Sequence, residues 1–162
     1  MESNAVFSPC KKYRYMLWRI WDAARPAIVV IGVNPSTADG TTNDNTMDRV
    51  IAIADNNGYG GVYMVNCYPI VSSDPKVLPD YINNLNDDSM QQNSYHLERA
   101  YSVCKDVVCA WGNFDIVRKT GRDKELRAQF PISLAFAVNK NGSPKHPLYC
   151  SKNTLFVEYD TL

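Results

Sequence analysis

The chain has 162 residues, of which 45% are hydrophobic and 21% charged, and its acidic and basic side chains balance to a formal net charge of zero. This length and composition are those of a globular protein, and we expect a single domain over residues 1–162. The neutral balance argues against a protein that coats a polyanion, although local basic patches are compatible with it.

The first predicted elements are a buried strand and a helix. Residues 27–33 read AIVVIGV, a continuous run of mostly β-branched side chains that is typical of a buried parallel strand. Residues 46–57 carry apolar side chains at helical spacing, and the pattern stops before Gly58. A second short strand is expected at residues 62–65, and a polar loop with three prolines follows it.

The second half of the chain continues the alternation. We expect a helix at residues 89–104, a strand at 107–110, a helix at 113–130 that Gly121 interrupts, and a fourth strand at 132–138. The order βαβαβαβ predicts an α/β fold with a mainly parallel four-stranded sheet. Helices on both faces of that sheet would make a three-layer sandwich.

The cysteines and the chain ends give further expectations. No stretch approaches the roughly 18 apolar residues that span a bilayer, and residues 1–12 lack the apolar run of a signal peptide. The five cysteines form no C-x-x-C pair and there are only two histidines, which argues against a disulfide framework and a metal site. We therefore expect a protein of the reducing cytoplasm with no membrane partner and no cofactor. The oligomeric state is left open.

The chemically distinctive residues come directly after each predicted strand. In open parallel sheets, ligands bind just outside the carboxyl ends of the strands, so four such loops are expected to converge on one site. The segments are N-P-S-T-A-D at 34–39, N-C-Y-P at 66–69, W-G-N at 111–113, N-K-N-G at 139–142 and K-H-P at 145–147.

Each residue of the first loop has a structural and a functional interpretation. Asn34 and Pro35 form a dipeptide that is common in turns that end strands. Ser36, Thr37 and Asp39 are residue types that cap helices. The free backbone N–H groups of such a loop equally suit a phosphate or a carboxylate.

The later loops offer the same choice. Asn66 is an amide just past an apolar strand, where it must bond the neighbouring backbone or a ligand edge with both a donor and an acceptor. Tyr68 is a core residue or a stacking platform for a flat ring, and for Trp111 the core is favoured. His146, beside Lys145, is a candidate hydrogen-bond donor or acid.

Four of these loop motifs, in this order, resemble the uracil-DNA glycosylase superfamily. GVNPS at residues 32–36 is similar to the G-I-N-P-G motif of the mismatch-specific uracil/thymine branch. YMVNCY at 63–68 is similar to the motif whose Asn pairs with the base edge. VVCAWGNF at 107–114 resembles the segment that ends in W-G, and KHP at 145–147 resembles the H-P motif of the leaving-group loop. The resemblance covers residues 27–148 and implies a uracil-DNA glycosylase-like fold.

A closer likeness, over nearly the whole chain, is to a bacterial and phage family of unknown function. Its signature contains Y-R-Y-x-L, N-P-S-T-A-D, D-x-T followed by Arg, G-Y-G-G, a strand ending in V-N, W-G, and G-x-P-x-H-P-L-Y. The matching positions here are 13–15, 34–39, Asp44 with Thr46 and Arg49, 58–61, Asn66, Trp111 with Gly112, and 142–149.

The glycosylase resemblance implies an N-glycosylase-like hydrolase that acts on a nucleobase in DNA or in a nucleotide. Such a reaction must stabilise charge on the departing base and place a water molecule. Asn34 would orient the water, Asp39 or Asp44 would act as the base, and His146 would donate a hydrogen bond to the leaving base. Contacts to the substrate are expected from Pro35, Ser36, Thr37, Asp44, Arg49, Asn66, Tyr68, Trp111, Gly112 and Lys145.

Two other functions fit the same sequence. The chain is alternatively a non-catalytic protein that sequesters a nucleotide or a nucleic-acid end on this scaffold. A protein-interaction module that has lost its pocket is the third alternative. Loss of base release in an Asn34→Ala or Asp39→Ala variant that still binds would favour the enzyme.

Overall fold

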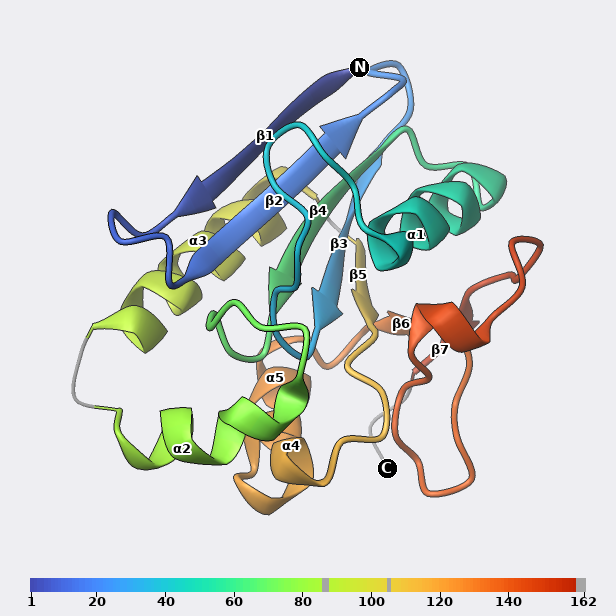
Figure 1. Cartoon of the computed structure of the whole chain (residues 1–162). Coiled ribbons are helices and arrows are strands. Elements are labelled where there is room, and N and C mark those ends of the chain that lie inside the picture. The colour runs from blue at the N-terminus through green and yellow to red at the C-terminus, as the bar shows by residue number, and fades with distance from the viewer. Residues whose placement is uncertain (86–87, 105, 160–162) are drawn as a thin grey trace.

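The computed structural model of the chain describes residues 1–85, 88–104 and 106–159. These residues form one seven-stranded mixed sheet with the strand order β1-β2-β4-β3-β5-β6-β7 (Figure 1). The strands are β1 (Glu2–Phe7), β2 (Arg14–Ile20), β3 (Ala27–Gly32), β4 (Gly61–Asn66), β5 (Asp106–Cys109), β6 (Leu134–Ala135) and β7 (Val157–Glu158).

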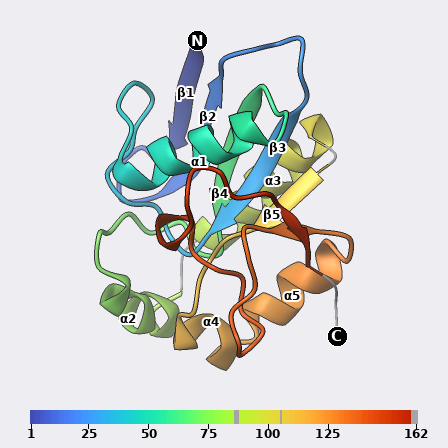
Figure 2. The same cartoon turned by 90° about the vertical axis from the view of Figure 1, so that its right-hand side faces the viewer.

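The α-helices cover both faces of this sheet, as Figures 1 and 2 show. Helix α1 lies on one face, and α3 lies on the other. The helices are α1 (Asn45–Asn56), α2 (Leu78–Asn83), α3 (Ser89–Val103), α4 (Asp115–Lys119) and α5 (Arg122–Gln129), with short 3-10 turns at Pro75–Val77 and Pro147–Tyr149. No helix among the described residues is long and apolar enough to cross a membrane.

Alternation along β3 explains why both faces are covered. Ile28 and Val30 pack into the apolar cluster that contains the buried face of α1. Val29 and Ile31 pack into the opposite cluster, which contains Leu97 of α3. A strand that is buried on both sides reads as a continuous apolar run, so the α/β class expected from the sequence is confirmed.

The predicted four-stranded sheet is incomplete, because the sheet has seven strands. The four expected strands are present, and β4, β3, β5 and β6 pair in parallel in that order. The structure adds the antiparallel strands β1 and β2 beyond β4, and β7 beyond β6. Strand β6 holds only two residues where seven were expected at 132–138.

The helix expected at residues 113–130 is two helices. Gly121 has a φ of 75°, a left-handed conformation that an α-helix cannot contain, and it separates α4 from α5. Both short helices bury one apolar side chain, Val117 and Leu126, in the same cluster as α3. The interruption lets two helical segments pack separately beside the carboxyl ends of the strands.

Candidate functional site

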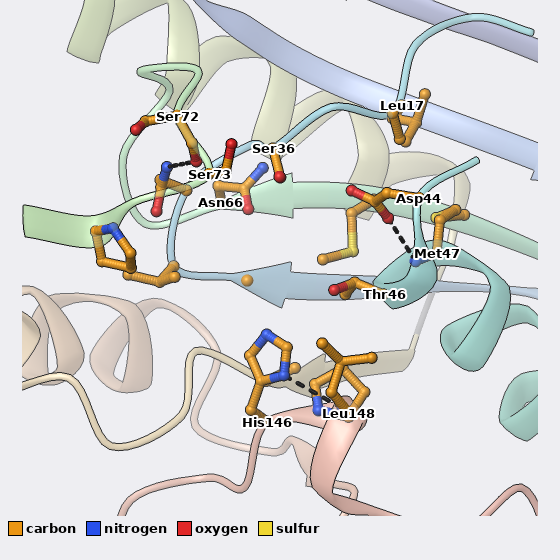
Figure 3. Close-up of a pocket in the computed structure, with 18 of the residues that line it drawn as sticks. Leu17, Ser36, Asp44, Thr46, Met47, Asn66, Ser72, Ser73, His146 and Leu148 are labelled. Atoms are coloured by element: carbon orange, nitrogen blue, oxygen red, sulfur yellow. Dashed lines mark hydrogen bonds between the residues drawn. The ribbon is translucent and has the colours of Figure 1, made fainter. Parts of the chain in front are cut away.

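A cavity of about 330 Å³ lies at the carboxyl ends of β3 and β4. Its walls come from β2, the loop after β3, the start of α1, the loop after β4 and residues 146–149 (Figure 3). Arg14, Leu17 and Asn66 form part of its buried inner end, whereas Ser73 and Tyr149 form its exposed rim. Segments far apart in the sequence therefore meet at the edge of the sheet where the loop motifs predict a site.

Asn66 is the most buried polar side chain of this cavity. It is the last residue of β4, pairs with Gly32 of β3, and has only 1% of its surface exposed. Its side-chain nitrogen is buried without a hydrogen-bond partner. A Cβ atom on Gly32 would lie 2.7 Å from Asn66 Oδ1, so the glycine leaves room for the amide in this orientation. Asn93 of α3 holds the main-chain carbonyl of Asn66 with a hydrogen bond of 3.0 Å.

Asn34 also borders the cavity, but its nitrogen is already used. Asn34 Nδ2 donates to the carbonyl oxygens of Pro35, Ile70 and Ser72 at 3.0–3.1 Å. These bonds join the loop after β3 to the loop after β4 and fix the orientation of the amide. Asn34 can therefore act on a ligand or a water molecule only through Oδ1.

The structure separates the two candidate bases. Asp44 borders the cavity, where its Oδ1 caps α1 by accepting the Met47 N–H at 2.8 Å (Figure 3). Asp39 is exposed and lies outside this cavity, on a separate shallow depression. Its Oδ1 accepts the backbone N–H groups of Thr41 and Thr42, which lowers the pKa of its carboxyl group. Of the two carboxylates, Asp44 is the one that can reach a ligand in the cavity.

His146 faces Asp44 and Asn66 across the cavity (Figure 3). Its Nδ1 accepts the backbone N–H of Leu148 at 3.2 Å, so the ring is held as the neutral form with its proton on Nε2. Burial lowers the pKa of His146, and the charge of Asp44 opposes this shift. The side chain is therefore a neutral imidazole whose Nε2–H is free of the Leu148 hydrogen bond.

Three of the predicted contact residues lie in the first loop or beside it. Ser36 borders the cavity, and Figure 3 shows its side chain there. Pro35 is buried and its carbonyl oxygen receives the Asn34 amide and the Ser72 N–H. Thr37 is exposed on the outer depression with Asp39. Of these three side chains, Ser36 is the one that borders the cavity.

Tyr68 and Trp111 belong to the core. Tyr68 does not line the cavity, so its ring is not placed to stack on a ligand there. The Tyr68 hydroxyl bonds Thr120 at 2.5 Å, and its ring meets Tyr81 edge-on. Trp111 is buried against Tyr159 and borders a second cavity, which the rest of the 111–114 loop also lines. Both aromatic rings lie in the cluster that α3 covers.

Three further predicted contacts act around the cavity. Gly112 has a φ of 73°, and a Cβ there would lie 3.3 Å from His146 Cβ, so this glycine lets the histidine loop approach. Arg49 of α1 donates to the carbonyl oxygen of Cys150 and ties α1 to the same loop. Lys145 lies in a shallow groove next to the cavity. Gly112 and Arg49 thus help to place the loop that carries His146, and Lys145 lines the groove beside it.

The site residues predicted from the sequence leave out several polar and aromatic residues that line the cavity, among them Arg14, Thr46, Phe114 and Ser72. Arg14 and Phe114 are the most informative. Phe114 follows the W-G-N segment and lines the cavity together with His146, as an aromatic residue that Tyr68 does not provide there. Arg14 starts a strand that the sequence pattern did not reveal. The Y-R-Y signature was the one signal that could have drawn attention to it.

The profile of a family described as "Protein of unknown function (DUF1643)" matches residues 14–148. That span holds every cavity residue discussed above except Tyr149. No curated protein and no solved structure matches the chain.

The tautomer and pKa of His146 are open to direct measurement. In an NMR titration we expect its pKa to lie below the usual value of about 6.5 and its proton to sit on Nε2 at neutral pH. A His146→Asn variant separates its signals from those of His96, whose pKa burial also lowers. Because the unfolded chain binds these protons at higher pH than the folded chain, the free energy of unfolding should fall as the pH drops below about 6.5. A His146 pKa above that value, or a proton on Nδ1, would contradict the assignment.

Proposed function

We propose that this chain, which belongs to the DUF1643 family, binds a nucleobase-containing ligand in the cavity and hydrolyses its N-glycosidic bond. The observation that carries the proposal is the buried amide of Asn66, whose nitrogen has no partner at a cavity wall. A buried polar group without a hydrogen bond is costly, so its presence at a cavity points to a ligand that supplies the bond.

The chemistry of an amide suits a base edge. Asn66 offers one acceptor oxygen and one donor nitrogen side by side, which matches the alternating carbonyl and N–H groups of a nucleobase. The hydrogen bond from Asn93 to the Asn66 carbonyl holds the backbone at this position. Phe114 supplies an aromatic surface in the same cavity on which a flat ring can pack.

The other cavity residues provide the means for hydrolysis. A water molecule would add to the sugar carbon while the electron pair of the C–N bond moves to the base. Asp44 would take the proton of that water, and Asn34 Oδ1 would help to orient it. His146 would donate its Nε2–H to the departing base and stabilise the charge that builds there. No metal is required by this scheme.

The proposal includes a uracil-DNA glycosylase-like fold. It is supported by the parallel pairing of β4, β3, β5 and β6 and by the four loop motifs at one end of those strands. It is also supported by the cavity residues Asn34, Asn66 and His146, which occupy the matched motif positions.

A second candidate is binding without chemistry. The side-chain nitrogen of Asn34 donates to three carbonyl oxygens. Asp39 lies outside the cavity, and its carboxylate accepts backbone N–H groups of its own loop. Two of the three residues expected to be catalytic therefore make structural hydrogen bonds. A protein that sequesters a nucleotide would need only Asn66 and its neighbours.

Asn66→Ala tests the recognition step. We expect this variant to bind its best nucleoside or nucleotide ligand at least tenfold more weakly than the wild type, because the base edge loses both amide partners. Calorimetric titration against a panel of nucleosides and their 5′-monophosphates provides the measurement. Asn153→Ala, which removes an exposed amide, is the matched control and should bind like the wild type. Equal affinities for the Asn66→Ala variant and the wild type would exclude the proposed base contact.

Asp44→Asn and Asp39→Asn test the chemical step as a pair. Asparagine still caps α1 but cannot take a proton, so Asp44→Asn should release base on the order of 10²-fold more slowly while it still binds. Asp39→Asn should release base at the wild-type rate. Base release is measured by mass spectrometry after incubation with free nucleotides and with single-stranded and duplex DNA that carries deaminated bases. Binding without release by the wild type would select the second candidate.

A further inference from the structure

Arg14 is a charged side chain at the inner end of the cavity. It begins β2, and only 3% of its surface is exposed. Nη1 donates to the carbonyl oxygen of Ala38 at 2.8 Å, and Nε is buried with no hydrogen-bond partner. None of the ion pairs between described residues includes Arg14. A buried guanidinium normally has a carboxylate or a full set of acceptors, and this one has neither.

Arg19 in the same strand provides an internal comparison. It is also buried, but each of its nitrogens is occupied: Nε donates to Asn43 Oδ1 at 2.8 Å, and Nη1 to the Trp18 carbonyl at 2.9 Å. Nη2 donates to the carbonyl oxygens of Asp39 and Thr42. Arg19 thus fastens the loop between β3 and α1. Arg14 borders the cavity, and its Nη1 donates to the backbone, whereas its Nε has no hydrogen-bond partner.

The charge of Arg14 is retained in spite of its burial. Desolvation lowers its pKa to about 10, and the nearby carboxylate of Asp44 favours the cation. The guanidinium is therefore still positive at neutral pH. Asp44 makes no ion pair with it within 4.0 Å, and its Oδ1 is bound to the first turn of α1. The guanidinium is therefore charged, and no carboxylate among the described residues bonds it directly.

The surroundings suit an oxyanion. Guanidinium groups bind phosphate and carboxylate oxygens through parallel N–H donors, and such bonds are stronger than neutral ones. The side chains of Ser36 and Thr46 lie on the same cavity and carry hydroxyl donors (Figure 3). A phosphate bound beside Arg14 would accept hydrogen bonds from the guanidinium nitrogens that the Ala38 carbonyl does not occupy.

The depth of Arg14 distinguishes a terminal phosphate from an internal one. A phosphodiester within a nucleic-acid strand continues into a sugar on both sides, so both chain segments would have to leave the cavity. A phosphate monoester has a sugar on one side only, so its phosphate can lie at a closed end. The exposed residues Ser73, Leu148 and Tyr149 mark the open side, and Arg14 is among the most buried residues of the wall. The formal net charge of zero also gives no general attraction to a nucleic-acid backbone.

We propose that Arg14 binds the terminal phosphate of a free nucleoside monophosphate whose base lies against Asn66. This inference rests on the proposed function and narrows its substrate to a mononucleotide. It assigns a specificity role to a residue of β2, outside the loops that follow the parallel strands.

The test compares nucleosides with their 5′-monophosphates by calorimetric titration of the wild-type protein. We expect the monophosphate of the preferred base to bind at least tenfold more tightly than the nucleoside. In Arg14→Met this ratio should fall to near one, whereas Arg99→Met, which alters an exposed arginine of α3, should preserve it. The wild-type comparison does not depend on whether the Arg14 variant folds.

Other results would overturn the proposal in distinguishable ways. Equal affinity of the wild type for nucleoside and monophosphate would reject the phosphate site but leave the proposed base site intact. Tighter binding of a 5′-phosphorylated single-stranded oligonucleotide than of the mononucleotide would reject the free-nucleotide assignment. Binding of inorganic phosphate with no gain from an attached base would reject both the nucleotide assignment and the proposed function.

Discussion

Parallel pairing of β3 with β4 sets Gly32 opposite Asn66, and the cavity depends on this register. The missing side chain at Gly32 leaves space for the amide, because a Cβ atom there would overlap its oxygen. Asn93 fixes the backbone of Asn66 from the α3 side of the sheet. A slip of one residue would turn the amide to the other face and place a valine or a cysteine at the cavity.

Around this amide, polar residues of the same type have divided roles. Arg19 uses its donors on backbone and Asn43, while Arg14 keeps a buried Nε without a partner. Asn34 uses its nitrogen to join two loops, while the nitrogen of Asn66 remains unbonded. In each pair, one residue has its side-chain nitrogens bonded within the wall, and the other keeps one buried nitrogen without a partner. This division is the physical basis for assigning a ligand to the cavity.

The sequence predicted the parallel centre of the sheet well, and its failures have physical causes. Residues 27–33 were recognisable because a strand buried on both faces is continuously apolar. Strand β2 was missed because its sequence RYMLWRI contains two arginines, and only the folded chain shows that both are buried. Tyr68 was placed at the site because it follows β4 closely. The chain turns after Asn66, so Tyr68 enters the core on the α3 side.

Position along the sequence also could not separate Asp39 from Asp44. Both follow β3 within a short polar segment, and either could cap a helix or reach a ligand. The path of the loop decides between them, since Arg19 draws the carbonyl groups of Asp39 and Thr42 toward the sheet and Asp44 becomes the first cap of α1. Such long-range hydrogen bonds are invisible to local patterns. His146 lines the cavity, and its tautomer depends on the Leu148 N–H, a contact that no sequence motif reveals.

A crystal structure of the protein soaked with its tightest-binding nucleoside or nucleotide would show whether Asn66 bonds the edge of a base in this cavity. We predict that the base lies with its edge within hydrogen-bond distance of the Asn66 amide and with a base atom facing His146 Nε2. A ligand bound elsewhere on the protein, with the Asn66 amide bonded only to water, would contradict it.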